Sequence, residues 1–215
     1  MSHYAPARGP VSYIYRDDHL ILIDKPSGLL SVPGRGVDKA DCAITRVQAE
    51  FPDALTVHRL DMATSGLLLM ARSKEIQRAL SGLFERGEVE KSYLADVWGV
   101  PAPARGEIDL PLITDWPNRP LQKVDHEIGK PSRTLYETLN PQSAHTRLKL
   151  TPLTGRSHQL RVHLAAIGHP ILGDEFYAAG EALTARPRLA LHAARLAFAH
   201  PVTGERMDFE LPCPF

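Results

Sequence analysis

The stretch V-H-R-L-D-M-A-T-S-G-L-L-L-M-A-R, from Val57 to Arg72, decides the fold of this chain. Its second half, Gly66 to Ala71, is an unbroken apolar run whose length fits a strand that is buried on both faces. The first half, His58 to Ser65, gathers a His, an Arg, an Asp, a Thr and a Ser directly before that strand. Because these side chains lie close to the core, an ionised Asp61 needs a cation or several hydrogen-bond donors. Asp61 is therefore a candidate functional residue, and the competing interpretation is that it only caps a turn.

Composition places the chain among ordinary globular proteins. With 215 residues, 43% of them hydrophobic and 23% charged, it can bury a sizeable core as one large domain or two small ones. No apolar run approaches the roughly 20 residues that span a bilayer, and the N-terminus lacks the apolar segment of a secretory signal. We expect residues 1–10 to be a flexible leader. Residues 11–215 contain no repeat and no dividing linker, and are expected to form a single domain.

The charges and the cysteines exclude some classes of protein. Lys and Arg together number 25, as do Asp and Glu, and the formal net charge of zero argues against a protein that coats nucleic acid indiscriminately. Any RNA binding would have to come from a local basic face. Cys42 and Cys213 lie far apart and have no C-x-x-C partner, so neither a disulfide nor a zinc knuckle is expected. This cysteine usage fits a protein of the reducing cytoplasm.

The other elements are predicted from alternating apolar positions, capping residues and turns. Ser73 is predicted to cap a helix that ends at Gly87, and Asp41 a helix that ends before Pro52. A third helix is predicted from Ser157. The expected strands are Val11–Tyr15, Leu20–Asp24, Gly66–Ala71, Lys91–Val97, Thr134–Leu139, Thr146–Thr151, Ala190–Phe198 and Met207–Leu211, and the expected helices are 41–50, Lys74–Arg86 and 157–167.

Residues 101–133 are rich in Pro and Gly and are expected to be an ordered excursion with short edge strands. The segment carries one tryptophan and several basic side chains that could stack on and neutralise single-stranded RNA. These residues are Trp116, Arg119, Lys123, Lys130 and Arg133. Packing of the Trp116 indole against the domain is the competing interpretation. A second basic stretch, from Arg72 to Lys91, is explained as well by a solvated helix face.

The third predicted helix includes the sequence G-R-S-H-Q-L-R-V-H, residues 155–163. Its core-facing stripe is expected to consist of Leu160, Leu164 and Ile167, with Gly168 at its end. Arg161 lies at the border of this stripe, where an arginine would be partly buried and would need a carboxylate. His158 and His163 are five residues apart and do not share a helical face, so a zinc site is not expected.

Four segments resemble the motifs of the RluA-type pseudouridine synthases. They are K-P-S-G-L-L from Lys25, H-R-L-D-x-x-T-S-G-L-L from His58, K-x-Y at Lys91–Tyr93 and G-R-x-H-Q-L-R-x-H from Gly155. The resemblance extends from about Val11 to the C-terminus. It implies an α+β fold in which helices flank a mixed, mainly antiparallel central sheet, with the catalytic cleft across the middle of that sheet.

The resemblance also implies roles for individual residues. Asp61 corresponds to the essential catalytic nucleophile or base, Arg161 to the arginine that pairs with it, and Tyr93 to the tyrosine that stacks on the target uracil. Lys25 corresponds to a residue that supports the catalytic loop, and the competing interpretation is a solvated charge at a strand end. The residues expected to contact the substrate are His58, Arg59, Lys91, Trp116, Arg119, Lys123, Lys130, Arg156 and His158.

The implied reaction is the isomerisation of uridine to pseudouridine in RNA. The N1–C1′ bond breaks, the base turns within its pocket, and C5 bonds to C1′, so no metal, cofactor or water nucleophile is expected. Asp61 would either attack C1′ or remove a ribose proton to give a glycal. The uridine must leave its stack, which costs a few kcal/mol. We expect Arg59 to occupy the space that the uridine leaves.

The segment D-L-P-L-I-T-D-W-P-N-R-P-L-Q-K-V, residues 109–124, and the short chain resemble the dual-specificity subgroup, whose members modify 23S rRNA at position 746 and the tRNA anticodon loop at position 32. We expect a monomer without an S4-type domain, which would recognise a hairpin loop by shape and would bind neither DNA nor membrane. Two alternatives remain. One is a non-catalytic RNA-hairpin-binding protein, and the other is a nucleoside hydrolase or base glycosylase that uses Asp61, although no second carboxylate is evident beside it.

Overall fold

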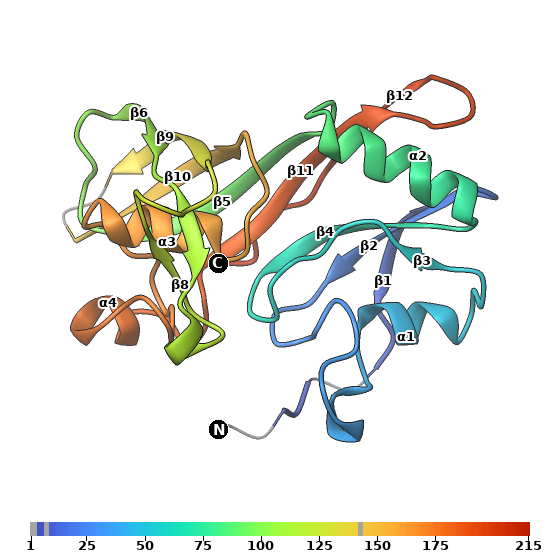
Figure 1. Ribbon diagram of the computed structural model, residues 1–215, viewed down its shortest axis with the longest axis horizontal. Coiled ribbons are helices and arrows are strands. Elements are labelled where there is room, and N and C mark those ends of the chain that lie inside the picture. Colours follow the sequence, from blue (N-terminus) through green and yellow to red (C-terminus); the bar gives the residue numbers. More distant parts are fainter. Residues whose placement is uncertain (1–3, 7–8, 142–143) are drawn as a thin grey trace. The chain divides into compact units, whose positions relative to one another are not determined.

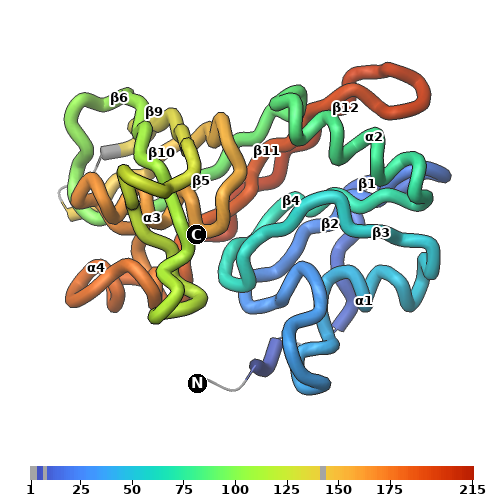
Figure 2. The backbone as a smooth tube through the Cα atoms, in the orientation of Figure 1, coloured from blue at the N-terminus to red at the C-terminus, as the bar shows by residue number. Residues whose placement is uncertain are grey.

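The computed structural model describes residues 4–6, 9–141 and 144–215 (Figure 1). The fold is α+β, as the resemblance implies, and the chain divides into two compact units. The first unit comprises Met1–Glu90 and Ala193–Pro212, and the second comprises Lys91–His192 and Cys213–Phe215. The chain passes from the first unit to the second and back inside two strands, and its path can be followed in Figure 2. The single domain expected over residues 11–215 stays a prediction.

Antiparallel strand pairs form the frame of the first unit. Its strands are β1 (Ser12–Arg16), β2 (Leu20–Lys25), β3 (Leu55–Thr56), β4 (Ser65–Ala71), β11 (Leu191–Ala199), which enters the unit at Ala193, and β12 (Arg206–Glu210). They are ordered β1-β2-β4-β11, with β3 also paired to β4 and β12 paired to β11. All seven residues of β4 are buried. This burial confirms the prediction that the apolar run is a strand covered on both faces.

Two helices cover the strands of the first unit, and Figure 1 shows α1 (Ala43–Gln48) and α2 (Lys74–Glu85) on opposite sides of them. Ser73 Oγ accepts a hydrogen bond of 3.2 Å from the N–H of Ile76, and Gly87 has a φ of +73°, as expected for the two ends of α2. The core on the α2 side is formed by Ile76, Leu80, Leu20, Leu22, Leu67, Leu69 and Phe198. The short 3₁₀ helix η1 (Val37–Lys39) precedes α1.

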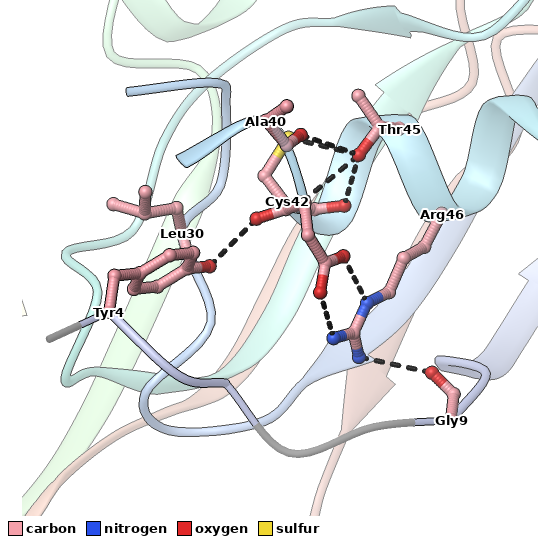
Figure 3. A network of polar contacts seen from close by, with 8 residues as sticks. Tyr4, Gly9, Leu30, Ala40, Cys42, Thr45 and Arg46 are labelled. Atoms are coloured by element: carbon pink, nitrogen blue, oxygen red, sulfur yellow. Dashed lines mark hydrogen bonds and ion pairs between the residues drawn. The ribbon is translucent and has the colours of Figure 1, made fainter. Parts of the chain in front are cut away.

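The prediction that Asp41 caps the first helix is wrong. Cys42 is the residue before α1, and its N–H donates to Thr45 Oγ1 at 3.0 Å (Figure 3). The carboxylate of Asp41 instead accepts two hydrogen bonds of 2.7 Å from Arg46. Both carboxylate oxygens of Asp41 are thus bound by the guanidinium of Arg46 in a bidentate, charge-assisted pair, and they are not directed at the end of the helix.

The N-terminal segment contacts the region around α1 at two points, which Figure 3 shows. The Tyr4 hydroxyl donates to the carbonyl of Asp41 at 2.8 Å and accepts from the N–H of Leu30 at 3.0 Å. Arg46 also donates to the carbonyl of Gly9 at 3.0 Å. Of the leader expected at residues 1–10, residues 1–3 and 7–8 lie outside the described residues.

The second unit contains an antiparallel sheet and a separate hairpin. The sheet strands are β5 (Glu90–Trp98), which enters the unit at Lys91, β6 (Arg105–Asp109), β9 (Arg133–Pro141) and β10 (His145–Pro152), and the hairpin strands are β7 (Leu112–Thr114) and β8 (Gln122–Val124). The sheet order is β5-β10-β9-β6, and the 3₁₀ helix η2 (Trp116–Asn118) lies in the β7–β8 connection. Of the turn predicted between β9 and β10, Gln142 lies outside the described residues.

The helices of the second unit are α3 (Gln159–Ala166) and α4 (Gly180–Thr184), and α4 is absent from the predicted elements. The stripe predicted for α3 is too narrow, because all six residues from Gln159 to Leu164 are buried. The helix is therefore enclosed on all sides from Gln159 to Leu164, and its polar side chains find hydrogen-bond partners inside the unit. Gly168, with a φ of +83°, follows its end as predicted. No helix in the described part of the chain is long and apolar enough to cross a membrane.

Candidate active site

Asp61 lies half-buried in the loop that connects β3 to β4. Its carbonyl accepts a hydrogen bond of 3.1 Å from the N–H of Thr64, which closes a turn. Thr64 and Ser65, which follow this turn, are buried at the start of β4. The polar segment His58–Ser65 therefore leads directly into the buried strand β4, as the sequence predicts.

Lys25 supports this loop from inside the protein. Its side chain is fully buried, and its Nζ donates to the carbonyls of Leu29 at 2.7 Å, Pro26 at 2.9 Å and Met62 at 3.2 Å. Met62 directly follows Asp61 in the chain. The interpretation of Lys25 as a solvated charge is wrong, because β2 carries the side chain into the core and the carbonyls there take the place of water.

The residues after Lys25 hold the Asp61 loop by further hydrogen bonds. The Ser31 hydroxyl donates to the carbonyl of Leu60 at 2.7 Å and accepts from the N–H of Leu60 at 3.1 Å. The N–H of Gly28 donates to the carbonyl of Met62 at 2.8 Å, and Ser27 Oγ donates to that of Ala63 at 2.7 Å. The backbone is thus fixed immediately before and immediately after Asp61. Gly28 has a φ of +83°, a conformation that a side chain would strain.

His58 and Arg59 have different environments. The Nε2 atom of His58 accepts a hydrogen bond of 3.0 Å from the N–H of Leu69, and its ring stacks on Phe84 at a centroid distance of 4.6 Å. Since an N–H can only donate, Nε2 carries no proton. The Arg59 side chain is exposed. His58 therefore fixes the start of the loop against β4, while Arg59 is accessible to a substrate.

Arg161 is buried in the second unit and paired with Asp174. Its Nε and Nη2 atoms donate to the two carboxylate oxygens of Asp174 at 2.8 and 2.5 Å, and both side chains are almost completely buried. The guanidinium carbon also lies 5.0 Å from the ring centroid of Phe176 and 5.2 Å from that of Tyr177. The sequence predicts a carboxylate partner for this arginine, which the resemblance implies to be Asp61, and it gives no indication of the partner Asp174.

The neighbouring polar residues of α3 fasten the helix to the sheet. Gln159 Nε2 donates to Thr134 Oγ1 at 3.0 Å, and His163 contacts Thr134 Oγ1 through Nδ1 at 2.9 Å and the carbonyl of Leu110 through Nε2 at 3.0 Å. Because a carbonyl can only accept, Nε2 carries the proton and Nδ1 accepts from the Thr134 hydroxyl. Burial lowers the pKa of His163, so the neutral ring is favoured.

The residues before α3 lie nearer the surface. Arg156 is exposed, and its Nε donates to the carbonyl of Pro131 at 3.3 Å. His158 has a φ of +53°, the one positive φ of a non-glycine residue in the described ranges. Its Nδ1 lies 2.7 Å from the hydroxyl of Tyr177. A left-handed conformation at a residue with a side chain stores strain and is enriched at functional sites.

Lys91 and Tyr93 lie two residues apart on β5. Both are half-buried, and burial lowers the pKa of the Lys91 ammonium. Tyr93 is opposite Leu150 of β10, so its backbone is held inside the sheet of the second unit.

The β7–β8 hairpin and the residues after it carry the exposed aromatic and basic side chains that the sequence analysis proposed to bind RNA. Trp116 is 63% exposed, and the guanidinium carbon of Arg119 lies 3.3 Å from its ring centroid. Packing of this indole into the domain is therefore excluded. Lys123 is exposed and paired with Asp125 at 3.6 Å, and Lys130 is exposed. Arg133 forms an ion pair with Glu107, so part of its charge is neutralised.

Comparisons with known proteins agree with the arrangement of these motifs. Residues 19–166 match the family model described as RNA pseudouridylate synthase. The chain belongs to this family. The matched range contains the Asp61 loop, Tyr93, the hairpin and Arg161. This chain therefore has the catalytic activity of the family, which is the isomerisation of uridine in RNA. The relatives show that it belongs to the RluA type within the family.

Curated relatives named dual-specificity RNA pseudouridine synthase RluA are similar to this chain over the whole of its length. The protein of Escherichia coli K12 is 52% identical over 217 residues, which cover 100% of this chain and 99% of the relative. That of Vibrio parahaemolyticus is 49% identical over 221 residues and is covered to 88%. Among solved structures, human RNA pseudouridylate synthase domain containing 1 has a TM-score of 0.79 at 28% identity, covering 98% of this chain and 87% of its own.

Some residues of the site carry no clear signal in the sequence. Asp174 follows the buried pair Ile171 and Leu172, and this polar residue after a buried segment is the signal that could have identified it. Tyr177 and Phe176 gave no signal beyond being aromatic. In the described residues, no group of three or more His, Cys, Asp or Glu side chains is arranged to hold a metal ion.

Proposed function

We propose that this synthase isomerises uridine in two RNA hairpin loops, at position 746 of 23S rRNA and at position 32 of the tRNA anticodon loop. The observation that supports this substrate range is the 52% identity, over all of this chain, to relatives named dual-specificity synthases. The segment at residues 109–124, which resembles the dual-specificity subgroup, forms the end of β6 and the β7–β8 hairpin, whose connection is exposed at residues 116–120. Such an enzyme acts in the cytoplasm, as a single catalytic domain and a monomer.

Asp61 is the catalytic residue in this proposal. It attacks C1′ of the uridine or removes a ribose proton as the N1–C1′ bond breaks. The uracil then turns and C5 bonds to C1′, which displaces Asp61 from C1′ in the first route and is accompanied by return of the proton to the ribose in the second. The proton at C5 is then lost and N1 gains one, so the product is an isomer of the substrate. The hydrogen bonds from Lys25, Gly28 and Ser31 fix the backbone on both sides of Asp61. A preorganised loop of this kind avoids reorganisation during the reaction.

The other roles follow the family motifs. Arg161 is the cationic partner that keeps Asp61 charged, and Tyr93 is the ring against which the uracil stacks. Arg59, which is exposed beside Asp61, takes the place of the uridine in the RNA stack. This proposal needs no cofactor, since the reaction neither adds nor removes atoms.

The exposed basic side chains of the second unit are proposed to bind the RNA backbone and loop bases. Trp116 presents an indole that is stacked on one side by Arg119, so its orientation is fixed before a base arrives. Lys123, Lys130 and Arg156 add positive charge at exposed positions. Lys91 and His158 complete the set of residues proposed to contact substrate, while His58 acts through its contact with β4.

Release of tritium from uridine C5 tests the reaction and the substrates together. The wild-type chain is incubated with an anticodon stem-loop, or with the ribosomal hairpin, that carries tritium at C5. We expect release to water by the wild type, loss of release in Asp61→Asn, and unchanged release in Asp18→Asn, which alters an exposed aspartate in the β1–β2 turn. Release of free uracil would instead establish a glycosylase, and RNA binding without tritium release would establish a non-catalytic binder.

A further inference from the structure

The turn from Gly173 to Tyr177 is built around the guanidinium of Arg161. One carboxylate oxygen of Asp174 accepts from Arg161 and also from the backbone N–H groups of Phe176 at 2.9 Å and Tyr177 at 3.3 Å. The rings of Phe176 and Tyr177 then lie against the same guanidinium. The position of the Tyr177 ring is therefore determined by Arg161 and its partner.

The hydroxyl of Tyr177 joins two other parts of the second unit. It accepts a hydrogen bond of 2.9 Å from the N–H of Gln122, the first residue of β8. It also lies 2.7 Å from Nδ1 of His158, the residue before α3. Since the Gln122 N–H can only donate, the single hydroxyl proton is available for His158 Nδ1. One oxygen atom thus connects the β7–β8 hairpin to the start of the helix that carries Arg161.

The two connected parts have separate proposed tasks. The hairpin carries the exposed Trp116 and Arg119 pair, which is proposed to bind RNA. His158 lies three residues before Arg161, one helical turn away, and holds a left-handed conformation, which is strained for a residue with a side chain. A strained residue of this kind persists only where its surroundings determine it, and the Tyr177 hydroxyl is part of those surroundings.

We propose that Tyr177 is a positioning residue, which couples the RNA-binding hairpin to the Arg161 helix so that bound RNA is presented in a fixed register to Arg161. The inference rests on the proposed RNA contact of the hairpin and deepens it. Tyr177 does not touch the reacting atoms. It acts through Gln122 and His158, and its ring continues to pack on Arg161 when the hydroxyl alone is removed.

Tyr177→Phe tests the proposal, and Tyr136→Phe is its matched control. Tyr136 lies in the same unit and also donates one hydroxyl hydrogen bond, to the carbonyl of Pro103 at 3.3 Å, away from the hairpin. We expect hydrogen–deuterium exchange of the β8 backbone to accelerate in Tyr177→Phe, because the Gln122 N–H loses its acceptor, and to stay at the wild-type rate in Tyr136→Phe. The KM for an anticodon stem-loop should rise about three- to tenfold in Tyr177→Phe, with kcat changed less than twofold.

A double-mutant cycle separates positioning from a merely structural effect. In the Trp116→Ala background, where the hairpin has lost its proposed RNA contact, Tyr177→Phe should no longer raise KM. Equal rises in both backgrounds, an unchanged KM, or unchanged exchange at β8 would each overturn the proposal. Failure of the proposed function looks different, since the wild type itself would then release no tritium from the RNA, whereas the exchange measurement is independent of activity.

Discussion

Removal of the Ser31 hydroxyl should destabilise the Asp61 loop more than any other single-atom change around it. This hydroxyl donates to the carbonyl of Leu60 and accepts from the N–H of the same residue, at 2.7 and 3.1 Å. Ser31 is 4% exposed and Leu60 7% exposed. In Ser31→Ala both backbone groups of Leu60 lose this partner at a place that water reaches poorly.

The magnitude follows from the cost of unsatisfied buried groups. A buried donor or acceptor that loses its partner costs about 1–3 kcal/mol, so two of them at Leu60 cost about 2–6 kcal/mol in the free energy of unfolding. Ser27→Ala provides a graded comparison, because Ser27 holds one carbonyl, that of Ala63, at a half-buried position. Its cost should be about 1 kcal/mol. The total free energy of unfolding of a typical domain is only about 5–15 kcal/mol, so the losses expected in the two variants are large enough to be measured and distinguished from each other.

The assays are urea unfolding followed by circular dichroism and kcat for tritium release at a temperature where each variant stays folded. Because Leu60 directly precedes Asp61, a displacement of its backbone moves the carboxylate that is proposed to be catalytic, and an error of about 1 Å can cost about a hundredfold in rate. We expect kcat to fall tenfold to a hundredfold in Ser31→Ala and less in Ser27→Ala. Two results would contradict this prediction. One is a free energy of unfolding of Ser31→Ala within about 0.5 kcal/mol of the wild type together with an unchanged kcat, and the other is an equal loss of unfolding free energy in Ser31→Ala and Ser27→Ala.

Three further perturbations test the second unit. Asp174→Asn removes the charged partner of the buried Arg161 and should cost about 3–5 kcal/mol in urea unfolding, and an unchanged midpoint would contradict this pairing. Burial and the nearby Arg188 lower the pKa of His192 to about 4, so below its unfolded pKa of about 6.5 only the unfolded chain takes up the proton. Stability should therefore fall by about 2 kcal/mol between pH 7.5 and pH 5, and equal unfolding midpoints at both pH values would exclude it. Trp116→Ala should raise the KM for RNA by about five- to a hundredfold, because stacking of a base on an aromatic ring contributes about 1–3 kcal/mol. An unchanged KM would show that Trp116 does not contribute to RNA binding.

The first unit was largely predictable because its pattern is local. The apolar run of β4 and the capped amphipathic α2 are strong signals that depend on neighbouring residues only. The error at Asp41 has the same origin. A capping residue is predicted from its position before the helix. The carboxylate of Asp41, however, is bound by Arg46, which lies five residues later within α1.

The second unit was less predictable because its decisive contacts are distant in sequence. Periodicity treats Gln159 and His163 as solvent-facing, yet both are buried and bonded to Thr134, more than twenty residues earlier in the chain. The polar side chains of α3 therefore made a buried helix look like one with a solvent-exposed face. Polar residues in a buried helix resemble an exposed face until their partners are known.

The partner of Arg161 was only partly predictable from the sequence. A buried guanidinium must have a carboxylate, so the sequence predicts that a partner exists, but the fold chooses which one. Asp174 meets this need from a turn thirteen residues away, and that same turn supplies Tyr177. Arg161 is consequently held by groups of its own unit, just as the backbone around Asp61 is held by Lys25 and its neighbours in the other. Because the Asp61 backbone and the Arg161 guanidinium are each held by contacts within their own unit, neither of these groups needs RNA to fix its position, which favours a preorganised site.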